Sequence, residues 1–313
     1  MHPVSMKKHS WISIVLFLAL IPMLLHSSMV TDGARYGLLL WYQSVVPALF
    51  PFMVISGLIV QFGGVQILMD PFYRVLRCFL PVTRNGCYVL ISGLLCGYPM
   101  GAKTCAEFVA DKRITASEGQ FLMAICNHPS PMFLLGYVYP FFAESFAPWN
   151  LLLSIYGPIL LLALAARKYD QESIDANDVV PLQEQTVDAA IISSVTVLCK
   201  IGGYLILFSI VIVFLRNMPF LPKYLRLFFI GSLEMTTGIR ELAASLPPEQ
   251  AFIASAAVLS FGGCSGIFQT KSVLTVSDSV HAKKAGLSIR PYIFWKMIHA
   301  VLSAGIAALV CNI

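Results

Sequence analysis

The segment "GYPMGAKT", residues 97–104, places helix-breaking residues and a lysine inside an apolar run. Gly97, Pro99 and Gly101 would interrupt a helix at this point. A break inside a membrane leaves backbone N–H and C=O groups unpaired, which is tolerated where they line a protein cavity. The following helix would aim its positive N-terminal end at that cavity, and Lys103 would add a full charge. Dipole and ammonium together predict an anion site suited to a carboxylate; alternatively, Lys103 extends to the cytoplasmic interface.

A second candidate group lies in "GSLEMTTGIREL", where Glu234 precedes the hydroxyls of Thr236 and Thr237. A carboxylate within a membrane is costly and needs a partner or a proton. Glu234 could therefore bind a coupling cation, carry a proton or accept a hydrogen bond from a substrate. The structural alternative is an ion pair with Lys200 or Arg240.

Two further breaks, "NHPSP" and "FGGCSG", carry small polar side chains that suit either a substrate or a sodium ion. These residues are Asn127, His128 and Ser130 at the first break, and Ser265 with Gln269 one turn beyond at the second. His128 is either a proton relay or a hydrogen-bonded structural residue. Tyr98 either stacks on an aromatic ring of a solute or packs the first break. Lys200 and Lys296 lie inside apolar stretches and receive no role.

The sequence contains none of the enzyme motifs that were considered. "GGCSG" is not a nucleophile elbow because Ile267 stands where the last glycine is needed. No phosphate-binding loop or HExxH motif occurs. We therefore expect no catalytic residue, no metal site and no cofactor other than a coupling Na⁺ or H⁺. Four of the eight cysteines recur nine residues apart, so that successive ones face opposite sides of a helix, and we expect them to serve packing: Cys78, Cys87, Cys96 and Cys105.

The composition is that of an integral membrane protein. The chain of 313 residues is 58% hydrophobic and only 12% charged, with a mean hydropathy of +0.77, whereas soluble domains carry about 25% charged residues. The net charge of +5 is spread thinly and forms no basic stripe. We therefore expect lipid and a small solute as partners, and no nucleic acid.

The order of apolar segments predicts an all-α polytopic membrane protein built from two inverted repeats. Each repeat reads helix, re-entrant hairpin, broken helix, helix, which gives three crossings and inverts the second repeat relative to the first. An N-terminal transmembrane helix within 1–35 precedes them, unless that segment is a cleaved signal peptide. The expected units are 36–167 (hairpin 87–110, broken helix 118–142), a cytoplasmic linker 168–188, and 189–313 (hairpin 226–246, broken helix 250–280).

The distribution of basic residues orients this arrangement. With a cytoplasmic N-terminus, the predicted inner flanks hold thirteen Lys or Arg and the outer segments hold five, as the positive-inside rule requires. Residues 66–82 read as an amphipathic helix on the membrane surface. The segment "RNMPFLPKYLR" is unusually basic for an outer loop.

The segment "SGLLCGYPMGAKTCAEFVADKRITASEGQFLMAICNHPSPMFLLG" resembles the sporulation integral membrane protein family (YlbJ, also called SpoVV), as do "GSLEMTTGIREL" and "LSFGGCSGIFQT". The resemblance covers about residues 36–312. It implies the nucleoside-recognition "Gate" domain, also found in the iron-transport permease and related to concentrative nucleoside transporters. It further implies transport during sporulation, with dipicolinic acid as the substrate of near relatives, and a location in the cell membrane, the forespore outer membrane included. The relation to nucleoside transporters implies a homo-oligomer.

The hypothesis that follows is a secondary-transporter-like permease that moves a small carboxylated or ring-bearing solute, nucleosides included, by alternating access. Two alternatives remain. One is a non-transporting scaffold of the spore envelope, in which Lys103 and Glu234 would tolerate neutral substitutions. The other is a membrane-embedded enzyme, which would need clustered acidic or histidine residues at a membrane face.

Overall fold

The computed structural model describes residues 4–166, 186–276, 283–284 and 286–312, with side chains for 13–166, 186–274 and 286–312. The described chain is helical apart from one antiparallel pairing of two residues each, β1 (Thr275–Val276) and β2 (Lys283–Lys284). Among the described residues, five helices are long and apolar enough to cross a membrane, or six if the bent pair α4 (Gly64–Phe79) and α5 (Arg84–Cys96) forms one span. The predicted all-α polytopic membrane fold is confirmed. Most of the predicted linker 168–188 lies outside the described residues.

The boundary predicted at residue 35 lies inside a continuous helical segment. Helix α1 (Val4–Leu25) ends before His26, and one long helical segment then runs from Ser27 to Gln61. This segment consists of α2 (Ser27–Leu40), a π-helical turn η1 (Trp41–Val45) and α3 (Val46–Gln61).

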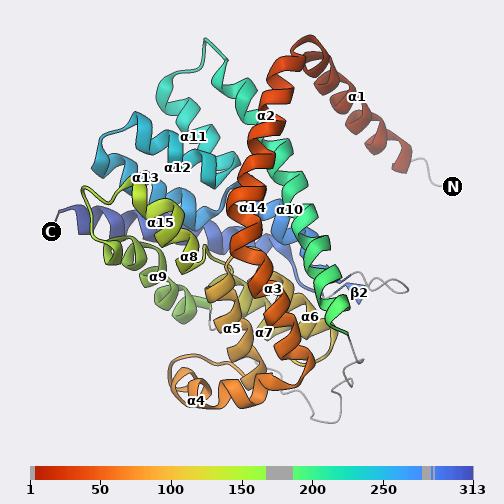
Figure 1. Cartoon of the computed structure of the whole chain (residues 1–313), viewed down its shortest axis with the longest axis vertical. Coiled ribbons are helices and arrows are strands. Elements are labelled where there is room, and N and C mark those ends of the chain that lie inside the picture. Colours follow the sequence, from red (N-terminus) through yellow and green to blue (C-terminus); the bar gives the residue numbers. More distant parts are fainter. Residues whose placement is uncertain (1–3, 167–185, 277–282, 285, 313) are drawn as a thin grey trace.

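Glycines of α2 bring this helix into backbone contact with α10 (Val187–Arg216), which runs beside it (Figure 1). A Cβ on Gly33 would lie 2.7 Å from Cα of Ile210, and a Cβ on Gly37 would lie 2.7 Å from Cα of Ile206. Since no real side chain tolerates such a distance, glycine is what permits this close helix pair. It joins the first half of the chain to the second.

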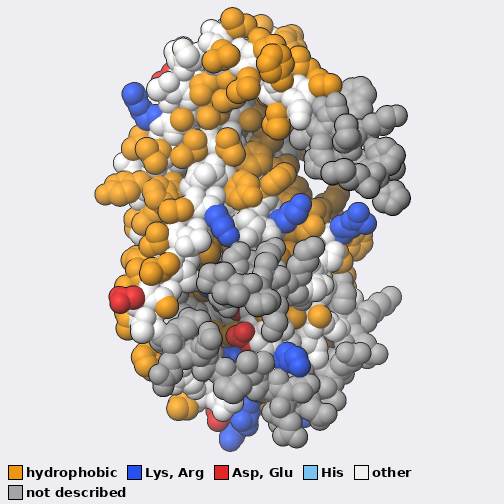
Figure 2. Space-filling model, turned by 90° about the vertical axis from the view of Figure 1, so that its right-hand side faces the viewer, with side chains coloured by type: hydrophobic (Ala, Val, Ile, Leu, Met, Phe, Trp, Pro, Cys, Tyr) orange, Lys and Arg blue, Asp and Glu red, His pale blue; other side chains and the backbone are white. Residues whose placement is uncertain are grey.

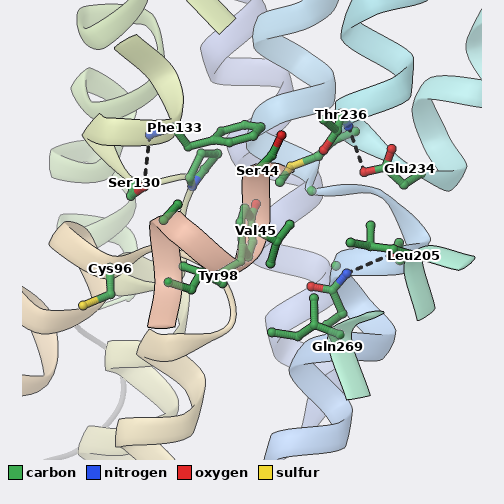
Figure 3. Close-up of a pocket in the computed structure, with 18 residues that line it drawn as sticks. Ser44, Val45, Cys96, Tyr98, Ser130, Phe133, Leu205, Glu234, Thr236 and Gln269 are labelled. Atoms are coloured by element: carbon green, nitrogen blue, oxygen red, sulfur yellow. Dashed lines mark hydrogen bonds between the residues drawn. The ribbon is translucent and has the colours of Figure 1, made fainter. Parts of the chain in front are cut away.

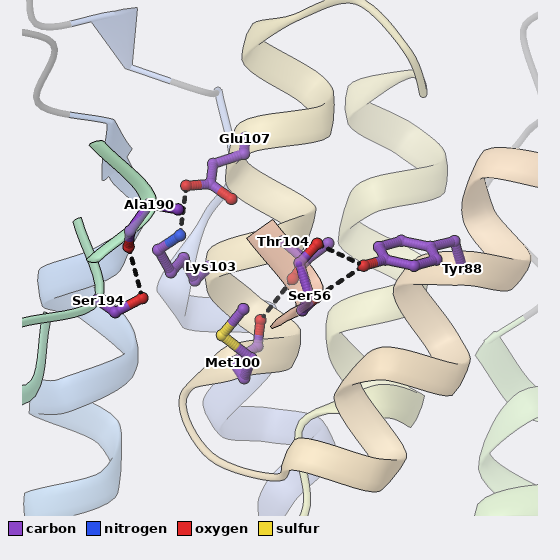
Figure 4. Close-up of polar contacts among 8 residues, drawn as sticks. All are labelled: Ser56, Tyr88, Met100, Lys103, Thr104, Glu107, Ala190 and Ser194. Carbon is purple, nitrogen blue, oxygen red and sulfur yellow. Dashed lines mark hydrogen bonds and ion pairs between the residues drawn. The ribbon is translucent and has the colours of Figure 1, made fainter. Parts of the chain in front are cut away.

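The rest of the first half folds around a helical hairpin. Helix α4 lies at the lower end of the molecule in Figure 1, and the chain bends by 95° between α4 and α5. The Tyr88 hydroxyl on α5 donates to the Ser56 carbonyl at 2.9 Å, which ties α5 to α3 (Figure 4). The elements are α4 (Gly64–Phe79), α5 (Arg84–Cys96), α6 (Met100–Ala110), α7 (Ala116–Cys126), α8 (Pro131–Phe133), the π-helical η2 (Leu134–Val138), the 3-10 turn η3 (Tyr139–Phe141) and α9 (Pro148–Ala165).

The second half presents a similar order of elements. Helices α11 (Lys223–Leu233) and α12 (Met235–Ser245) form a second hairpin that packs on α13 (Pro248–Phe261). Helix α14 (Gly263–Val273) follows α13 directly, and α15 (Ile289–Cys311) packs against α13 and α9. This order matches the predicted one, but the inverted relation between the halves stays a prediction.

The surface of the molecule suits a lipid environment. Large apolar side chains stand exposed on several of the long helices, for example Leu160, Leu207 and Val301. On the face shown in Figure 2, apolar side chains cover much of the upper part, while lysines and arginines lie mainly in the middle and lower parts. The molecule is thus a multi-pass membrane protein.

The basic turn between α10 and α11 is held by the ends of neighbouring helices. Arg216 forms an ion pair with Glu241. Lys223 donates to the carbonyl of Ser245 at the end of α12, and Arg226 donates to the carbonyl of Arg216. Because cations are favourable near unpaired C-terminal carbonyls, these contacts account for the basic segment by local structure.

Candidate functional site

The turn of the first hairpin contacts the break of the first broken helix. Gly97 has a φ of +79°, a conformation that favours glycine. A Cβ on Gly97 would lie 2.7 Å from the backbone nitrogen of Ser130. Glycine at this position therefore lets the α5–α6 turn lie directly against the segment between α7 and α8.

The break of the second broken helix contacts the same turn from the other half. Gly262 has a φ of +83° and separates α13 from α14. A Cβ on Gly262 would lie 2.6 Å from the hydroxyl oxygen of Tyr98, and that hydroxyl donates to the Leu259 carbonyl at 3.1 Å. Gly263, with a φ of +69°, approaches the Leu233 carbonyl in the second hairpin. The four predicted breaks thus meet in one region.

Each of these breaks is followed by a helix that begins there. Helices α6, α12 and α14 begin at Met100, Met235 and Gly263, and the short α8, which continues into η2, begins at Pro131. Helix N-termini carry unpaired N–H groups and a partial positive charge, so their meeting favours negative charge in the space between them.

The caps of these helices differ. Glu234 is buried and its carboxylate accepts the N–H groups of Thr236 at 2.9 Å and Thr237 at 2.7 Å. The Ser130 hydroxyl accepts the N–H of Phe133. No described side chain caps α14, whose N-cap is Gly262. Helix α6, whose N-cap is Pro99, also has no side-chain cap, but Asn127 accepts the N–H of Ala102 in its first turn. The N-terminus of α14 is therefore the one most available to a ligand.

A pocket lies between these breaks and the wall formed by α3 and α10 (Figure 3). Its cavity volume is about 70 Å³, and the pocket is partly open to the outside. Glu234 is the charged residue of its lining, which includes no lysine or arginine. The lining residues are Ser44, Val45, Ala48, Leu49, Cys96, Tyr98, Pro129, Ser130, Phe133, Ile201, Leu205, Glu234, Met235, Thr236, Gly262, Ser265, Gly266 and Gln269.

The pocket brings together about half of the residues predicted from the sequence. The predicted residues in its lining are Tyr98, Ser130, Glu234, Thr236, Ser265 and Gln269. The amide of Gln269 donates to the Ser265 hydroxyl at 2.9 Å, which fixes both side chains. The predicted residues outside its lining are Gly97, Pro99, Gly101, Lys103, Asn127, His128 and Thr237. Apart from Lys103, these shape the breaks or hold neighbouring helices.

Lys103 does not reach the pocket. Its Nζ pairs with the Glu107 carboxylate one turn further along α6, at 2.6 Å (Figure 4). The expected combination of helix dipole and ammonium at the cavity is therefore absent from this structure. The alternative ion pairs of Glu234 with Lys200 or Arg240 are not found among the described residues either, since the Glu234 carboxylate caps α12.

Asn127 connects the first break to two helices of the second half. Its amide nitrogen donates to the Thr270 hydroxyl at 3.0 Å and to the Tyr292 hydroxyl at 2.8 Å. Its side-chain oxygen accepts the N–H of Ala102 in α6. Asn127 is fully buried, so it acts through these three partners.

Helix α15 carries a buried polar stripe that was not predicted from the sequence. Tyr292, Lys296, His299 and Ser303 are all buried on one side of this helix. Lys296 contacts His128, and the ring of His299 lies against that of His128 with a centroid distance of 4.5 Å. The spacing of four, three and four residues in an apolar helix was the available signal, because it places these side chains on one face.

The chain resembles a known sporulation protein over part of its length. It is 28% identical to the sporulation integral membrane protein YlbJ of Bacillus subtilis (strain 168) over 206 residues, which are 57% of this chain and 50% of YlbJ. The chain thus aligns with about half the length of that relative. No protein-family model matches the chain, and no solved structure matches it. The predicted resemblance to the YlbJ family is confirmed, while the Gate domain stays a prediction.

Proposed function

We propose that this chain, which resembles the sporulation integral membrane protein YlbJ, is a permease that carries a small carboxylated or ring-bearing solute across a membrane. The solute would bind in the pocket between the four breaks. Dipicolinic acid is the solute that the family resemblance implies, and a nucleoside is the second candidate.

The observation that carries this proposal is that helices from both halves begin at one pocket: its lining includes residues at the starts of α8, α12 and α14, and Tyr98 just before α6. Each helix terminus contributes a partial charge of roughly +0.5. A carboxylate near Ser265 and Gly266 would accept N–H groups of the uncapped first turn of α14. Interrupted helices that present their N-termini to a substrate near the membrane midplane are a recurring feature of secondary transporters.

The remaining walls of the pocket suit a ring. Val45, Leu49, Phe133 and Leu205 supply apolar surface, and Tyr98 supplies an aromatic ring at the edge of the pocket. A flat aromatic acid would bury its ring against these side chains and direct its carboxylates at the polar end.

Glu234 is the observation that favours the second candidate. A carboxylate in the pocket repels an anion but accepts hydrogen bonds from hydroxyl groups such as those of a ribose. A coupling cation bound at Glu234 would reconcile the carboxylate with an anionic solute, so a role for Na⁺ or H⁺ is part of this proposal.

Transport would proceed by alternating access, with the two hairpins as gates on opposite sides of the pocket. The proposal includes a cytoplasmic N-terminus, a role in the forespore membrane and a homo-oligomeric state. The scaffold and enzyme alternatives are distinguished from it by ligand binding: a scaffold needs no solute in this pocket, and an enzyme would convert the solute.

The test is solute binding by the purified full chain, measured by thermal shift and by calorimetry with dipicolinate and with uridine. The blocking variant is Gly266→Leu. Gly266 is buried in the pocket lining, yet an added Cβ would meet nothing within 4 Å, so a leucine would extend into the pocket. The control is Gly203→Leu, an exposed position on α10 where a Cβ also meets nothing.

Both substitutions remove a glycine from a helix, and this removal stabilises the helix by about 0.5–1 kcal/mol. We expect one of the two solutes to bind wild type and Gly203→Leu with the same affinity. Gly266→Leu should bind that solute at least about tenfold more weakly. Absence of binding to wild type would reject both solutes. Equal binding by all three proteins would reject this pocket.

A further inference from the structure

Lys296 is a fully buried lysine with only neutral groups around it. Its Nζ lies 3.2 Å from the backbone carbonyl oxygen of Asn127 and 3.3 Å from Nδ1 of His128. It also lies 4.7 Å from the centre of the Tyr98 ring. Within the described part of the chain, no carboxylate forms an ion pair with it. A buried ammonium without a counter-ion is expensive, and such residues in membrane spans are commonly functional.

Two histidines complete a cluster of nitrogen bases around this lysine. The rings of His128 and His299 meet edge to face at 75°, and both residues are fully buried. Nε2 of His299 lies 2.8 Å from the Ile155 carbonyl, and because a carbonyl only accepts, this nitrogen carries the hydrogen. Nδ1 of a neutral His299 then carries no hydrogen. Among the described residues, neither this atom nor Nε2 of His128 has a partner within hydrogen-bond geometry.

The cluster can hold one proton more readily than two. Lys296 and His128 are close enough to share a proton, which can move from Nζ to Nδ1 and leave a neutral amine beside an imidazolium. Positive charges at these separations disfavour one another. The other polar or titratable groups that face the cluster among the described residues carry no carboxyl group: Cys126 at the end of α7, Tyr98 in the first hairpin, Tyr156 on α9, Ser260 on α13, Thr270 on α14 and Tyr292 on α15.

The cluster is separated from the pocket by one aromatic ring. Tyr98 lines the pocket and also contacts Nζ of Lys296. Pro129 and Ser130, which line the pocket, directly follow His128 in the chain. The pocket lining itself contains no lysine or arginine, so Lys296 is the cation best placed to respond to a negative charge bound there.

We propose that Lys296, His128 and His299 form one proton-binding site behind Tyr98, and that this site takes up a proton when an anionic solute enters the pocket. The second part of this inference rests on the proposed function. The coupling ion would accordingly be H⁺, and entry of the solute and of the proton would be thermodynamically linked, because a nearby anion favours the protonated form of a base.

The first experiment counts protons during solute binding. Calorimetry of dipicolinate binding at neutral pH, in buffers that differ in ionisation enthalpy, gives the number of protons taken up per solute. We expect about one for wild type and for Lys200→Met, whose lysine stands exposed on α10, and near zero for Lys296→Met. Equal uptake by wild type and Lys296→Met would overturn the proposal.

The second experiment needs no solute and separates this inference from the proposed function. Difference titration of the full chain in detergent between about pH 5 and pH 9 should release about one proton more from wild type than from Lys296→Met. If no solute binds but this difference is found, the transport proposal fails and the proton site stands. If the titrations coincide, the proton site is rejected. Methionine matches the apolar stem of lysine and removes a buried charge, so Lys296→Met should fold; His128→Asn, which removes the shared base, serves as a second variant.

Discussion

Gly93 and Gly101 hold the two helices of the first hairpin in backbone contact: a Cβ on Gly93 would lie 2.9 Å from Cα of Gly101. The second hairpin contains a matching pair, since a Cβ on Gly238 would lie 2.5 Å from Cα of Gly231. Each pair spans the break of its own hairpin. Two copies of one ancestral unit would have this correspondence, so it supports the predicted repeat at the level of single residues.

Replacing Gly238 by alanine should therefore destabilise the protein. The added Cβ would meet the backbone of the facing helix, which cannot rotate away, and we expect a loss of about 1–3 kcal/mol in the free energy of unfolding. The control is Gly305→Ala on α15, where a Cβ meets nothing within 4 Å and helix propensity predicts a small gain. Thermal unfolding in detergent measures both. Equal melting temperatures would show that the hairpin tolerates separation of its helices.

Asn127→Ala should destabilise the protein by about 2–4 kcal/mol, because buried hydroxyls of Thr270 and Tyr292 each lose a hydrogen-bond partner. The matched change Asn217→Ala, at the exposed end of α10, should alter the free energy of unfolding by about 0.5 kcal/mol or less. Chemical or thermal unfolding of the two variants gives the comparison. A similar small effect at both positions would mean that water replaces the Asn127 amide at little cost.

Glu234→Gln should have two separable effects. A glutamine side chain has one oxygen where the carboxylate has two, so one of the N–H groups of Thr236 and Thr237 loses its acceptor, at a cost of about 1–3 kcal/mol. When no cation is bound at Glu234, loss of the negative charge should raise the affinity for dipicolinate by up to about tenfold; it should lower the affinity for a nucleoside. The control is Glu249→Gln, on the exposed start of α13. An unchanged dipicolinate affinity would mean that the carboxylate does not act on the bound solute.

Lys103→Met should leave solute affinity within about twofold of wild type, because Lys103 pairs with Glu107 and does not line the pocket. The i,i+4 pair itself contributes only about 0.3–0.5 kcal/mol. Calorimetry with the solute that wild type binds provides the measurement. A tenfold weaker binding would instead restore the sequence-based assignment of Lys103 to the anion site, reached through a rearrangement of α6.

The helix breaks could be predicted from the sequence because their cause is local. Glycine and proline at 97–101, and the two glycines at 262–263, interrupt a helix whatever the surrounding fold is. The structure has helix breaks at both positions. Glu107, four residues beyond Lys103, was also visible as a helical ion-pair partner, and this local signal outweighs the long-range expectation of an anion site.

What could not be predicted depends on packing between distant segments. Lys296 and His128 are 168 residues apart, and their contact follows from the position of α15 against the first break. In the sequence alone, a lysine within an apolar span looks the same whether its side chain faces lipid or a buried histidine. Lys200 and Lys296 show both outcomes, the first exposed and the second fully buried.

The glycine-mediated contact between α2 and α10 also limits how the molecule can change shape. Two helices whose backbones touch at Gly33 and Gly37 cannot slide or roll without first separating, since interlocked packing resists continuous deformation. This pair would therefore serve as the stationary frame of a transport cycle. Helix α14, which begins at a break, touches α10 through side chains instead, Phe268 lying against Tyr204 and Phe208. It would belong to the moving part, displaced along one wall of the frame.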